Sequence, residues 1–125
     1  MRSAIVGYVL VVDDEEDIRE TLCELIELKG CKTQMAANGA EALEHLVVEK
    51  PCLVVLDLMM PVMGGHALLE KMRADPTLAE VPVIVSTSAP HLAPRDVPVV
   101  PKPIDIAKMV EWVSRYCLCV SAAAD

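Results

Sequence analysis

Five polar residues stand where the predicted strands end. They are Asp13, Asp14, Asp57, Thr87 and Lys102. Asp57 is a candidate carboxylate nucleophile, Thr87 a hydroxyl donor and Lys102 a cation, which together are the parts of a phosphoryl-transfer site. Three neighbouring carboxylates repel one another unless a cation neutralises them, and oxygen ligands that retain water suit Mg²⁺.

The elements that must position these residues follow from apolar periodicity. Helices are predicted to begin near Ile18, at the Asn38 cap, after Gly65 and at the Asp105 cap, with Glu41 completing a capping box at Asn38. Short apolar or β-rich runs predict five strands at residues 9–12, 32–36, 52–56, 82–86 and 97–100. Strands alternating with helices indicate an α/β fold with a doubly wound parallel sheet, whose ligands bind outside the carboxyl ends of the strands.

Four motifs in this order resemble the receiver domains of two-component signalling. They are Val11-Val12-Asp13-Asp14, Asp57-Leu58-Met59-Met60-Pro61 with Gly65, residues 82–87, and Lys102-Pro103. The resemblance covers residues 8 to about 117, within a single expected domain of residues 1–125. It implies a flavodoxin-like, five-stranded parallel sheet of strand order 2-1-3-4-5.

The resemblance also implies a role for each residue. Asp57 would accept a phosphoryl group from the phosphohistidine of a histidine kinase or phosphotransfer protein. Mg²⁺ would be bound directly by Asp14, Asp57 and the Met59 carbonyl, and by Asp13 mostly through water. Lys102 would pair with Asp57 and later with the phosphoryl oxygens, its peptide bond to Pro103 being cis.

The Thr87 hydroxyl would then move toward the new phosphate and switch the interaction with a downstream protein, which the sequence does not identify. Such a chain is a signalling phosphoacceptor rather than an enzyme, although it catalyses its own phosphorylation and dephosphorylation. Met59 and Ala89, which are apolar, occupy positions that flank the path of the hydrolytic water in this family. We therefore expect slow dephosphorylation.

Two departures from the family affect the output side. Residues 88–96 are too few for a helix with its connections, and Pro90 and Pro94 oppose one, so the family's fourth helix should be shortened to a loop or a single turn. Val99 occupies the position where receivers carry an aromatic residue whose rotation reports phosphorylation. The usual readout is therefore not expected.

Other functions of the same fold stay open. The departures favour a receiver-like interaction module that does not turn over phosphate, although all five site residues are present. An aspartyl-nucleophile phosphohydrolase usually has an acid two residues after the nucleophile, where this chain has Met59. Flavin binding requires a phosphate loop after the first strand, where Asp13-Asp14-Glu15 would repel phosphate.

Composition disfavours two classes of partner and indicates where the protein is located. A net charge of −8 and an aromatic content of 2% disfavour nucleic acids and membrane surfaces as partners. No apolar run approaches the length of a membrane span, so a cytoplasmic location is expected. The cysteines at 23, 31, 52, 117 and 119 form no spaced pairs and lie mostly in apolar runs, so reduced, structural thiols are expected.

Overall fold

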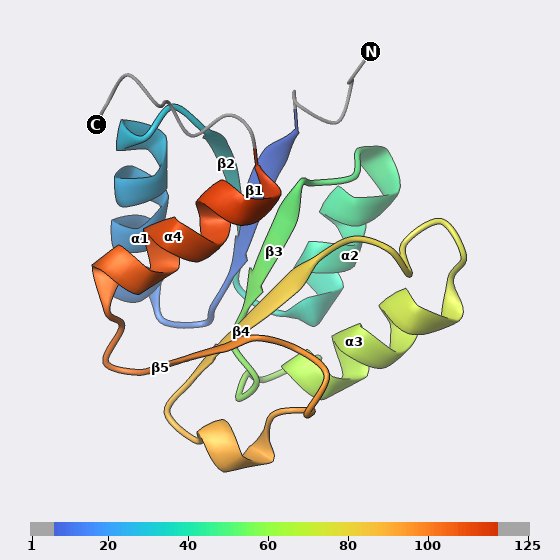
Figure 1. Cartoon of the computed structure of the whole chain (residues 1–125). Helices are drawn as coiled ribbons and strands as arrows, with labels where there is room; N and C mark the ends of the chain where they lie inside the picture. Colours follow the sequence, from blue (N-terminus) through green and yellow to red (C-terminus); the bar gives the residue numbers. More distant parts are fainter. Residues whose placement is uncertain (1–6, 118–125) are drawn as a thin grey trace.

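The computed structural model describes residues 7–117 as one parallel sheet covered by helices on both faces (Figure 1). The strand order is β2-β1-β3-β4-β5, which confirms the order expected from the resemblance. The strands are β1 (Tyr8–Val12), β2 (Lys32–Ala36), β3 (Leu53–Leu56), β4 (Val83–Thr87) and β5 (Val99–Pro101). The helices are α1 (Glu16–Leu28), α2 (Gly39–Val48), α3 (Gly65–Ala74) and α4 (Ile106–Tyr116).

Two apolar clusters form the core, one on each face of the sheet. Every residue of β1 and β3 is buried, as expected for parallel strands that lie between two layers of helices. Alternate side chains of these strands point to opposite faces. One set packs with α1 and α4, where Ile26 and Met109 are each 1% exposed, and the other set packs with α2 and α3, where Leu46 and Leu68 are buried.

The predicted caps hold the helices at the places that the sequence indicated. The Asn38 side chain accepts a hydrogen bond from the Glu41 amide, and the Asp105 side chain accepts one from the Lys108 amide. The Glu41 carboxylate accepts a hydrogen bond from the Ala37 amide at 2.8 Å. The capping box therefore uses the amide of the residue before Asn38 rather than that of Asn38 itself. Within residues 7–117, no helix is long and apolar enough to cross a membrane.

The segment between β4 and β5 forms a single 3₁₀ turn at Pro90–Leu92, as the spacing and the prolines predicted. The β5 strand that follows is an edge strand of the sheet and is only three residues long. Pro98 precedes this strand, Pro101 ends it and Pro103 follows Lys102. The Lys102–Pro103 peptide bond is cis, as the resemblance implied.

The expectation of reduced cysteines is wrong for the described residues other than Cys23. Cys52 and Cys117 form a disulfide, and Cys31 is also disulfide-bonded, whereas Cys23 is a free, buried thiol. Cys52 immediately precedes β3, and Cys117 ends α4, which packs on the sheet near that point. Sequence spacing could not indicate this pair because the fold brings together residues that are 65 positions apart. Cys119 lies outside the described residues.

Candidate functional site

The hydrogen-bonded ladder of the sheet continues one residue beyond the strands and holds the predicted site residues. The Asp13 amide donates to the Ala36 carbonyl at the end of β2, and the Asp57 amide donates to the Val12 carbonyl at the end of β1. The Lys102 amide likewise donates to the carbonyl of Thr87, the last residue of β4. The backbone thus fixes these residues at one edge of the sheet, as the sequence predicted.

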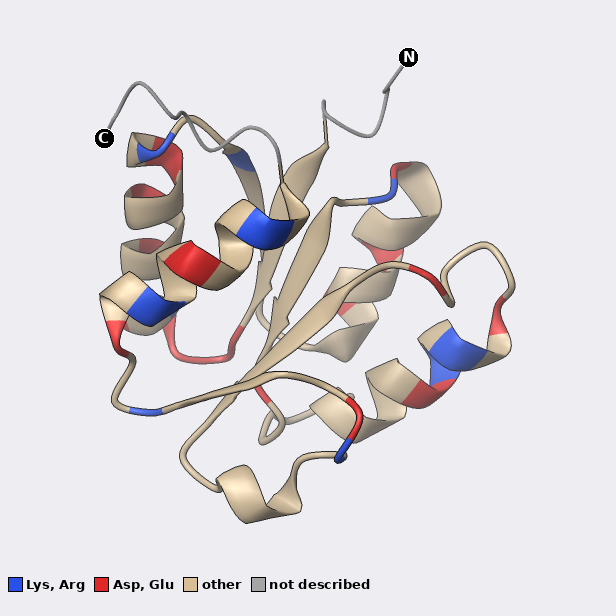
Figure 2. Ribbon diagram, viewed as in Figure 1, with Lys and Arg blue, Asp and Glu red and all other residues tan. Residues whose placement is uncertain are grey.

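Three carboxylates meet at this edge. Oxygens of Asp13, Asp14 and Asp57 all lie within 4.8 Å of one another. Asp13 and Asp57 are buried, at 2% and 5% exposure, whereas Asp14 is exposed to solvent. Figure 2 shows acidic residues in the loops that follow β1 and β3, which lie at the same end of the sheet. Carboxylates this close repel one another, so the cluster favours a bound cation.

Lys102 supplies one positive charge to this cluster. Its Nζ lies 2.8 Å from Asp13 Oδ2 and 3.6 Å from Asp57 Oδ2. The predicted pairing with Asp57 is therefore present, but the shorter contact is with Asp13. Glu15, which the sequence did not indicate as a partner of Lys102, lies 3.7 Å from the same ammonium. Only its place in the acidic run after β1 could have indicated this contact.

The fourth strand ends at this edge with Thr87. Thr87 is fully buried, and its Oγ1 accepts a hydrogen bond from the Ala89 amide at 3.0 Å. Met59 lies in the loop after β3 with its side chain largely exposed, and its amide lies 3.4 Å from Asp57 Oδ1. Arg19 of α1 donates to the Asp13 carbonyl at 2.8 Å, which fixes the loop that carries Asp13 and Asp14. The sequence did not indicate this contact of Arg19.

Burial and charge change the acidity of the two central groups. Burial raises the pKa of Asp57 to about 6, Lys102 opposes this rise, and the Asp13 carboxylate adds to it. For Lys102, burial acts to lower the pKa, but the hydrogen bond with Asp13 and the charges of Asp13, Asp57 and Glu15 outweigh burial and raise it. Asp57 is therefore mostly ionised at neutral pH, and Lys102 stays charged.

The raised pKa of Asp57 makes the stability of the metal-free protein depend on pH. The ordinary value is 3.8 and the folded value about 6, so the folded state holds this proton more tightly than the unfolded state. Stability therefore falls as the pH rises between these values. At about 1.4 kcal/mol for each pKa unit, the ionised carboxylate costs the folded state about 3 kcal/mol above this range.

We expect Asp57→Asn to stabilise the metal-free protein by about 1–3 kcal/mol at pH 8, because the amide carries no charge to desolvate. Urea unfolding with a chelator present measures the gain. It should disappear below about pH 4, where the wild-type carboxyl is neutral in both states. A variant that is no more stable than the wild type at pH 8 would show that burial does not penalise the Asp57 carboxylate.

Gly65, the first residue of α3, packs directly against the backbone that carries Asp57. A Cβ atom at residue 65 would lie 2.6 Å from the Asp57 carbonyl oxygen and 2.8 Å from Leu58 Cα. Both are backbone atoms, which cannot turn aside as a flexible side chain can. The Gly65 amide also donates to the Leu58 carbonyl at 3.1 Å. The absence of a side chain at this position therefore lets α3 begin beside the backbone of Asp57.

Gly65→Ala should destabilise the protein by about 3 kcal/mol, because the added methyl group forces the Asp57 backbone to shift. The neighbouring Gly64→Ala is the matched control. Its Cβ would come no closer than 3.3 Å to the Leu58 carbonyl oxygen, so we expect a loss of about 1 kcal/mol or less. Equal losses in the two variants, measured by urea unfolding, would contradict the role assigned to residue 65.

The donor set fits a hard divalent cation. Asp13, Asp14, Asp57 and Glu15 bring four carboxylates to this edge, whereas Lys102 is their one cationic contact among the described residues. Negative charge therefore remains in excess. The ligand atoms are all oxygens, and the exposure of Asp14 leaves access for water, which suits Mg²⁺ because it usually keeps several water ligands.

Comparison with known proteins gives the family. The model of the response regulator receiver domain matches residues 9–114. An uncharacterised 14.6 kDa protein from Leptolyngbya boryana is 33% identical over 117 residues, covering 88% of this chain and 89% of that protein. Response regulator Rre1 of Synechocystis is 38% identical over 81 residues, but the match covers 64% of this chain and only 35% of Rre1. The chain thus spans about a third of the length of this longer regulator.

A solved structure agrees with the sequence comparisons. The signal receiver domain of a signal transduction histidine kinase from Syntrophus aciditrophicus superposes with a TM-score of 0.79 at 28% identity, covering 93% of both chains. The sheet order, the acidic edge and the match over residues 9–114 agree. The chain belongs to the response regulator receiver domain family.

Proposed function

We propose that this chain is the phosphoacceptor of a two-component phosphorelay, in which Asp57 takes a phosphoryl group and thereby switches a protein–protein interaction. The observation that carries the proposal is the buried Asp57 carboxylate, which lies within 4.8 Å of two further carboxylates and 3.6 Å from the Lys102 ammonium. A nucleophile, a cation and acidic ligands at one edge of the sheet are the parts that phosphoryl transfer requires.

In the proposed reaction, a carboxylate oxygen of Asp57 attacks the phosphorus of a phosphohistidine. The new O–P bond forms as the N–P bond breaks, and the imidazole leaves with its electron pair. Mg²⁺ held by Asp14, Asp57 and the Met59 carbonyl, with Asp13 mostly through water, would neutralise charge on the transferred oxygens. Lys102 then shifts from Asp57 to the phosphoryl oxygens, and the Thr87 hydroxyl turns to donate a hydrogen bond to them.

The proposed donor is a histidine kinase or a phosphotransfer protein in the cytoplasm. An apolar hollow of about 290 Å³ lies beside the site, between the start of α1 and the segment after β5. It is lined by Ile18, Leu22, Lys102, Pro103, Ile104 and Ile106 among others. Apolar side chains next to the cation offer a docking surface for a protein that carries the phosphohistidine, rather than for a small phosphate ester.

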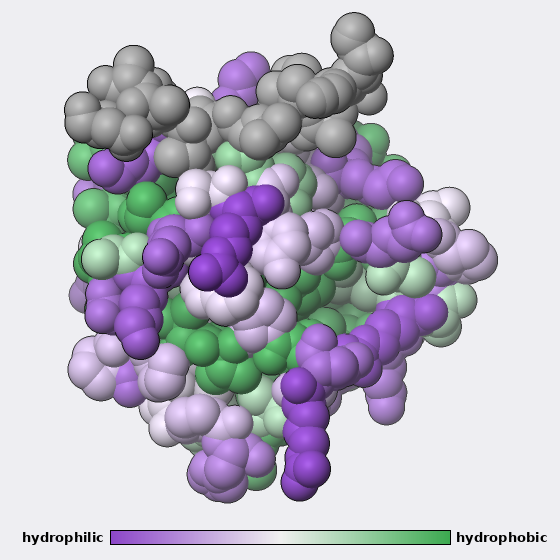
Figure 3. All heavy atoms as spheres, in the orientation of Figure 1, coloured by the Kyte–Doolittle hydropathy of each residue, from purple (hydrophilic) through white to green (hydrophobic). Residues whose placement is uncertain are grey.

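The proposed downstream contact lies on the side where the helix between β4 and β5 is curtailed. Figure 3 shows apolar side chains gathered on the face between α4 and β5. Val97 and Val99 are half-buried, Tyr116 of α4 is 40% exposed, and Val97 and Tyr116 line the same hollow. The position of Val99 holds no aromatic ring, so a switch would have to act through this apolar surface. Interface mapping with and without beryllium fluoride, a phosphoryl mimic, tests this part of the proposal.

The proposed function is tested by incubating the chain with acetyl phosphate and Mg²⁺ and measuring its intact mass. We expect one phosphoryl group per molecule, and none when a chelator removes the divalent cation. A folded chain that acquires no phosphoryl group would support the interaction module instead, which Val99 and the 3₁₀ turn favour. Continuous release of phosphate from a phosphomonoester would indicate a phosphohydrolase.

The Met59 side chain is 59% exposed beside Asp57 and offers no polar atom to orient water. We therefore expect slow hydrolysis of the phosphorylated chain, and Met59→Asn should shorten its lifetime about tenfold by supplying a hydrogen bond to the attacking water. The decay of the phosphorylated mass after removal of acetyl phosphate measures this change. Met59→Leu is the matched control and should leave the lifetime unaltered, whereas equal lifetimes in all three proteins would rule out control by residue 59.

A further inference from the structure

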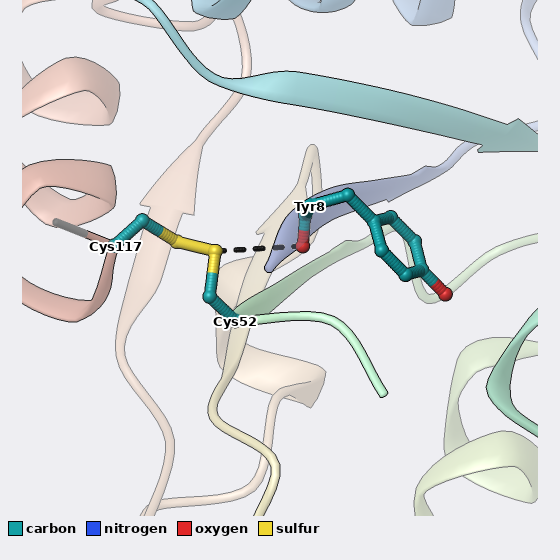
Figure 4. Close-up of a disulfide and its surroundings, with 3 residues drawn as sticks. All are labelled: Tyr8, Cys52 and Cys117. Atoms are coloured by element: carbon teal, nitrogen blue, oxygen red, sulfur yellow. Dashed lines mark hydrogen bonds between the residues drawn. A yellow bond between two sulfur atoms is a disulfide. The ribbon is translucent and has the colours of Figure 1, made fainter. Parts of the chain in front are cut away.

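A disulfide ties the end of the last helix to the start of the central strand, at the end of the sheet opposite the acidic site. Cys52 precedes β3 and Cys117 follows α4, with their Cα atoms 5.5 Å apart (Figure 4). Asp57 lies at the opposite end of β3. This pair is therefore separate from the phosphoacceptor site, and the proposed reaction makes no use of it.

The two cysteine residues differ in their exposure to solvent. Cys117 is buried, at 1% exposure, whereas Cys52 is half-buried. Cys52 also lines a hollow of about 570 Å³, together with Gly7, Pro51, Thr77, Val81 and Tyr116 among others. Cys117 does not line this hollow. An external thiolate can therefore reach the Cys52 sulfur more readily than the Cys117 sulfur.

The surrounding contacts do not depend on the disulfide. The Cys52 amide donates to the Tyr8 carbonyl at 2.8 Å, and the Cys117 amide donates to the Val113 carbonyl at 2.8 Å. Met109 and Val113 keep α4 in the core. The Cys52 Sγ lies 3.4 Å from the Tyr8 carbonyl oxygen, so a reduced Cys52 thiol has an acceptor in place (Figure 4). Both reduced side chains thus fit the same fold.

We propose that Cys52 and Cys117 form a reversible redox site, at which a cellular dithiol attacks the Cys52 sulfur and releases the end of α4. The inference rests on the cytoplasmic location in the proposed function, because disulfides in that compartment are mostly transient, catalytic or redox-sensing. Reduction would remove the covalent tie between β3 and the last turn of the helix, which carries Tyr116, on the face proposed for the downstream contact.

The exchange has two steps. A thiolate of the dithiol attacks Cys52 Sγ, the disulfide bond breaks, and its electron pair passes to the Cys117 sulfur, which takes up a proton. The second thiol of the donor then attacks the mixed disulfide and releases Cys52, whose sulfur is protonated. Two electrons have moved, so the protein disulfide is reduced and the donor is oxidised to its own disulfide.

The test uses the full oxidised chain with dithiothreitol under native conditions, followed by alkylation and peptide mapping. We expect Cys52 and Cys117 to become alkylated together while the far-ultraviolet circular dichroism keeps its folded form, and oxidised glutathione to restore the bond. Cys31 lies on a separate tryptic peptide, whereas Cys117 and Cys119 share one, so fragmentation of that peptide assigns the alkylated residue. Reduction that requires denaturant, loss of the fold on reduction, or failure to re-form the bond would each overturn the proposal.

Two single variants test the direction of attack. In Cys117→Ser the remaining Cys52 should form a mixed disulfide with oxidised glutathione. In Cys52→Ser the buried Cys117 should form one at least about tenfold more slowly. Faster reaction of Cys117 would overturn the assignment of Cys52. These experiments count thiols, so they test the redox site even if the chain takes no phosphoryl group. Phosphorylation is measured separately, so it tests the proposed function even if the thiols do not react.

Discussion

Asp57→Asn should take up no phosphoryl group from acetyl phosphate in the presence of Mg²⁺, under conditions where the wild type becomes phosphorylated. The amide of asparagine has no carboxylate oxygen to attack phosphorus, and the variant removes one of the three carboxylates that meet at the edge of the sheet. Asp13 is bonded to Lys102 at 2.8 Å and to the Glu15 amide at 2.9 Å, so it is not a free substitute. Intact mass measurement gives the result directly.

Two controls make this result specific. Asp96→Asn removes a carboxylate that pairs with Arg73 at 2.9 Å on the surface, outside the acidic cluster, and should accept phosphate as the wild type does. Hydroxylamine should remove the adduct from the wild type, because it cleaves acyl phosphates and leaves phosphate esters such as phosphothreonine intact. An adduct on Asp57→Asn, or a wild-type adduct that resists hydroxylamine, would move the acceptor to another residue.

Lys102→Met should destabilise the metal-free protein by about 3–5 kcal/mol at pH 8, because it leaves buried carboxylates without their cation. The Lys102 ammonium contacts Asp13 at 2.8 Å and Asp57 at 3.6 Å, and both acids are almost fully buried. The loss should shrink as the pH falls toward 4, because protonation of the Asp57 carboxyl, whose pKa burial raises to about 6, removes part of the repulsion. Added Mg²⁺ should also recover part of it, since a ligand that binds only the folded state stabilises that state.

The same variant should accept phosphate at least about 100-fold more slowly, because a positioned cation stabilises charge that develops during transfer. Lys108→Met, on the exposed surface of α4, removes the same charge outside the site and is the matched control. Urea unfolding and the rate of mass increase measure the two effects. If Lys102→Met and Lys108→Met behaved alike, the ammonium of residue 102 would have no part in holding the acids or the phosphate.

The sequence predicted the positions of the site residues because polar residues at the ends of buried strands are conspicuous. The apolar runs before Asp13 and Asp57 are typical of strands between two helical layers, and parallel strands bring their carboxyl ends to one edge. The 3₁₀ turn at Pro90–Leu92 was also predictable, because the number of residues and the prolines left no room for a helix.

The sequence could not predict the features that depend on contacts between side chains distant in the chain. The choice of Asp13 as the nearest partner of Lys102 follows from a difference of less than 1 Å between two carboxylates. The Cys52–Cys117 pair depends on how α4 lies on the sheet, which periodicity does not specify. Periodicity gives the order and the faces of the elements, whereas such contacts depend on the final packing of the helices.

The short outer strand β5 has a consequence for how this protein can meet others. A strand at the rim of a sheet normally presents a row of N–H donors on which a further strand can assemble. Proline at 101 and 103 removes donors on the side away from β4, and only three residues pair with β4. Extension of the sheet by a foreign peptide or by a second copy is therefore opposed at this rim, so binding there must rely on side chains.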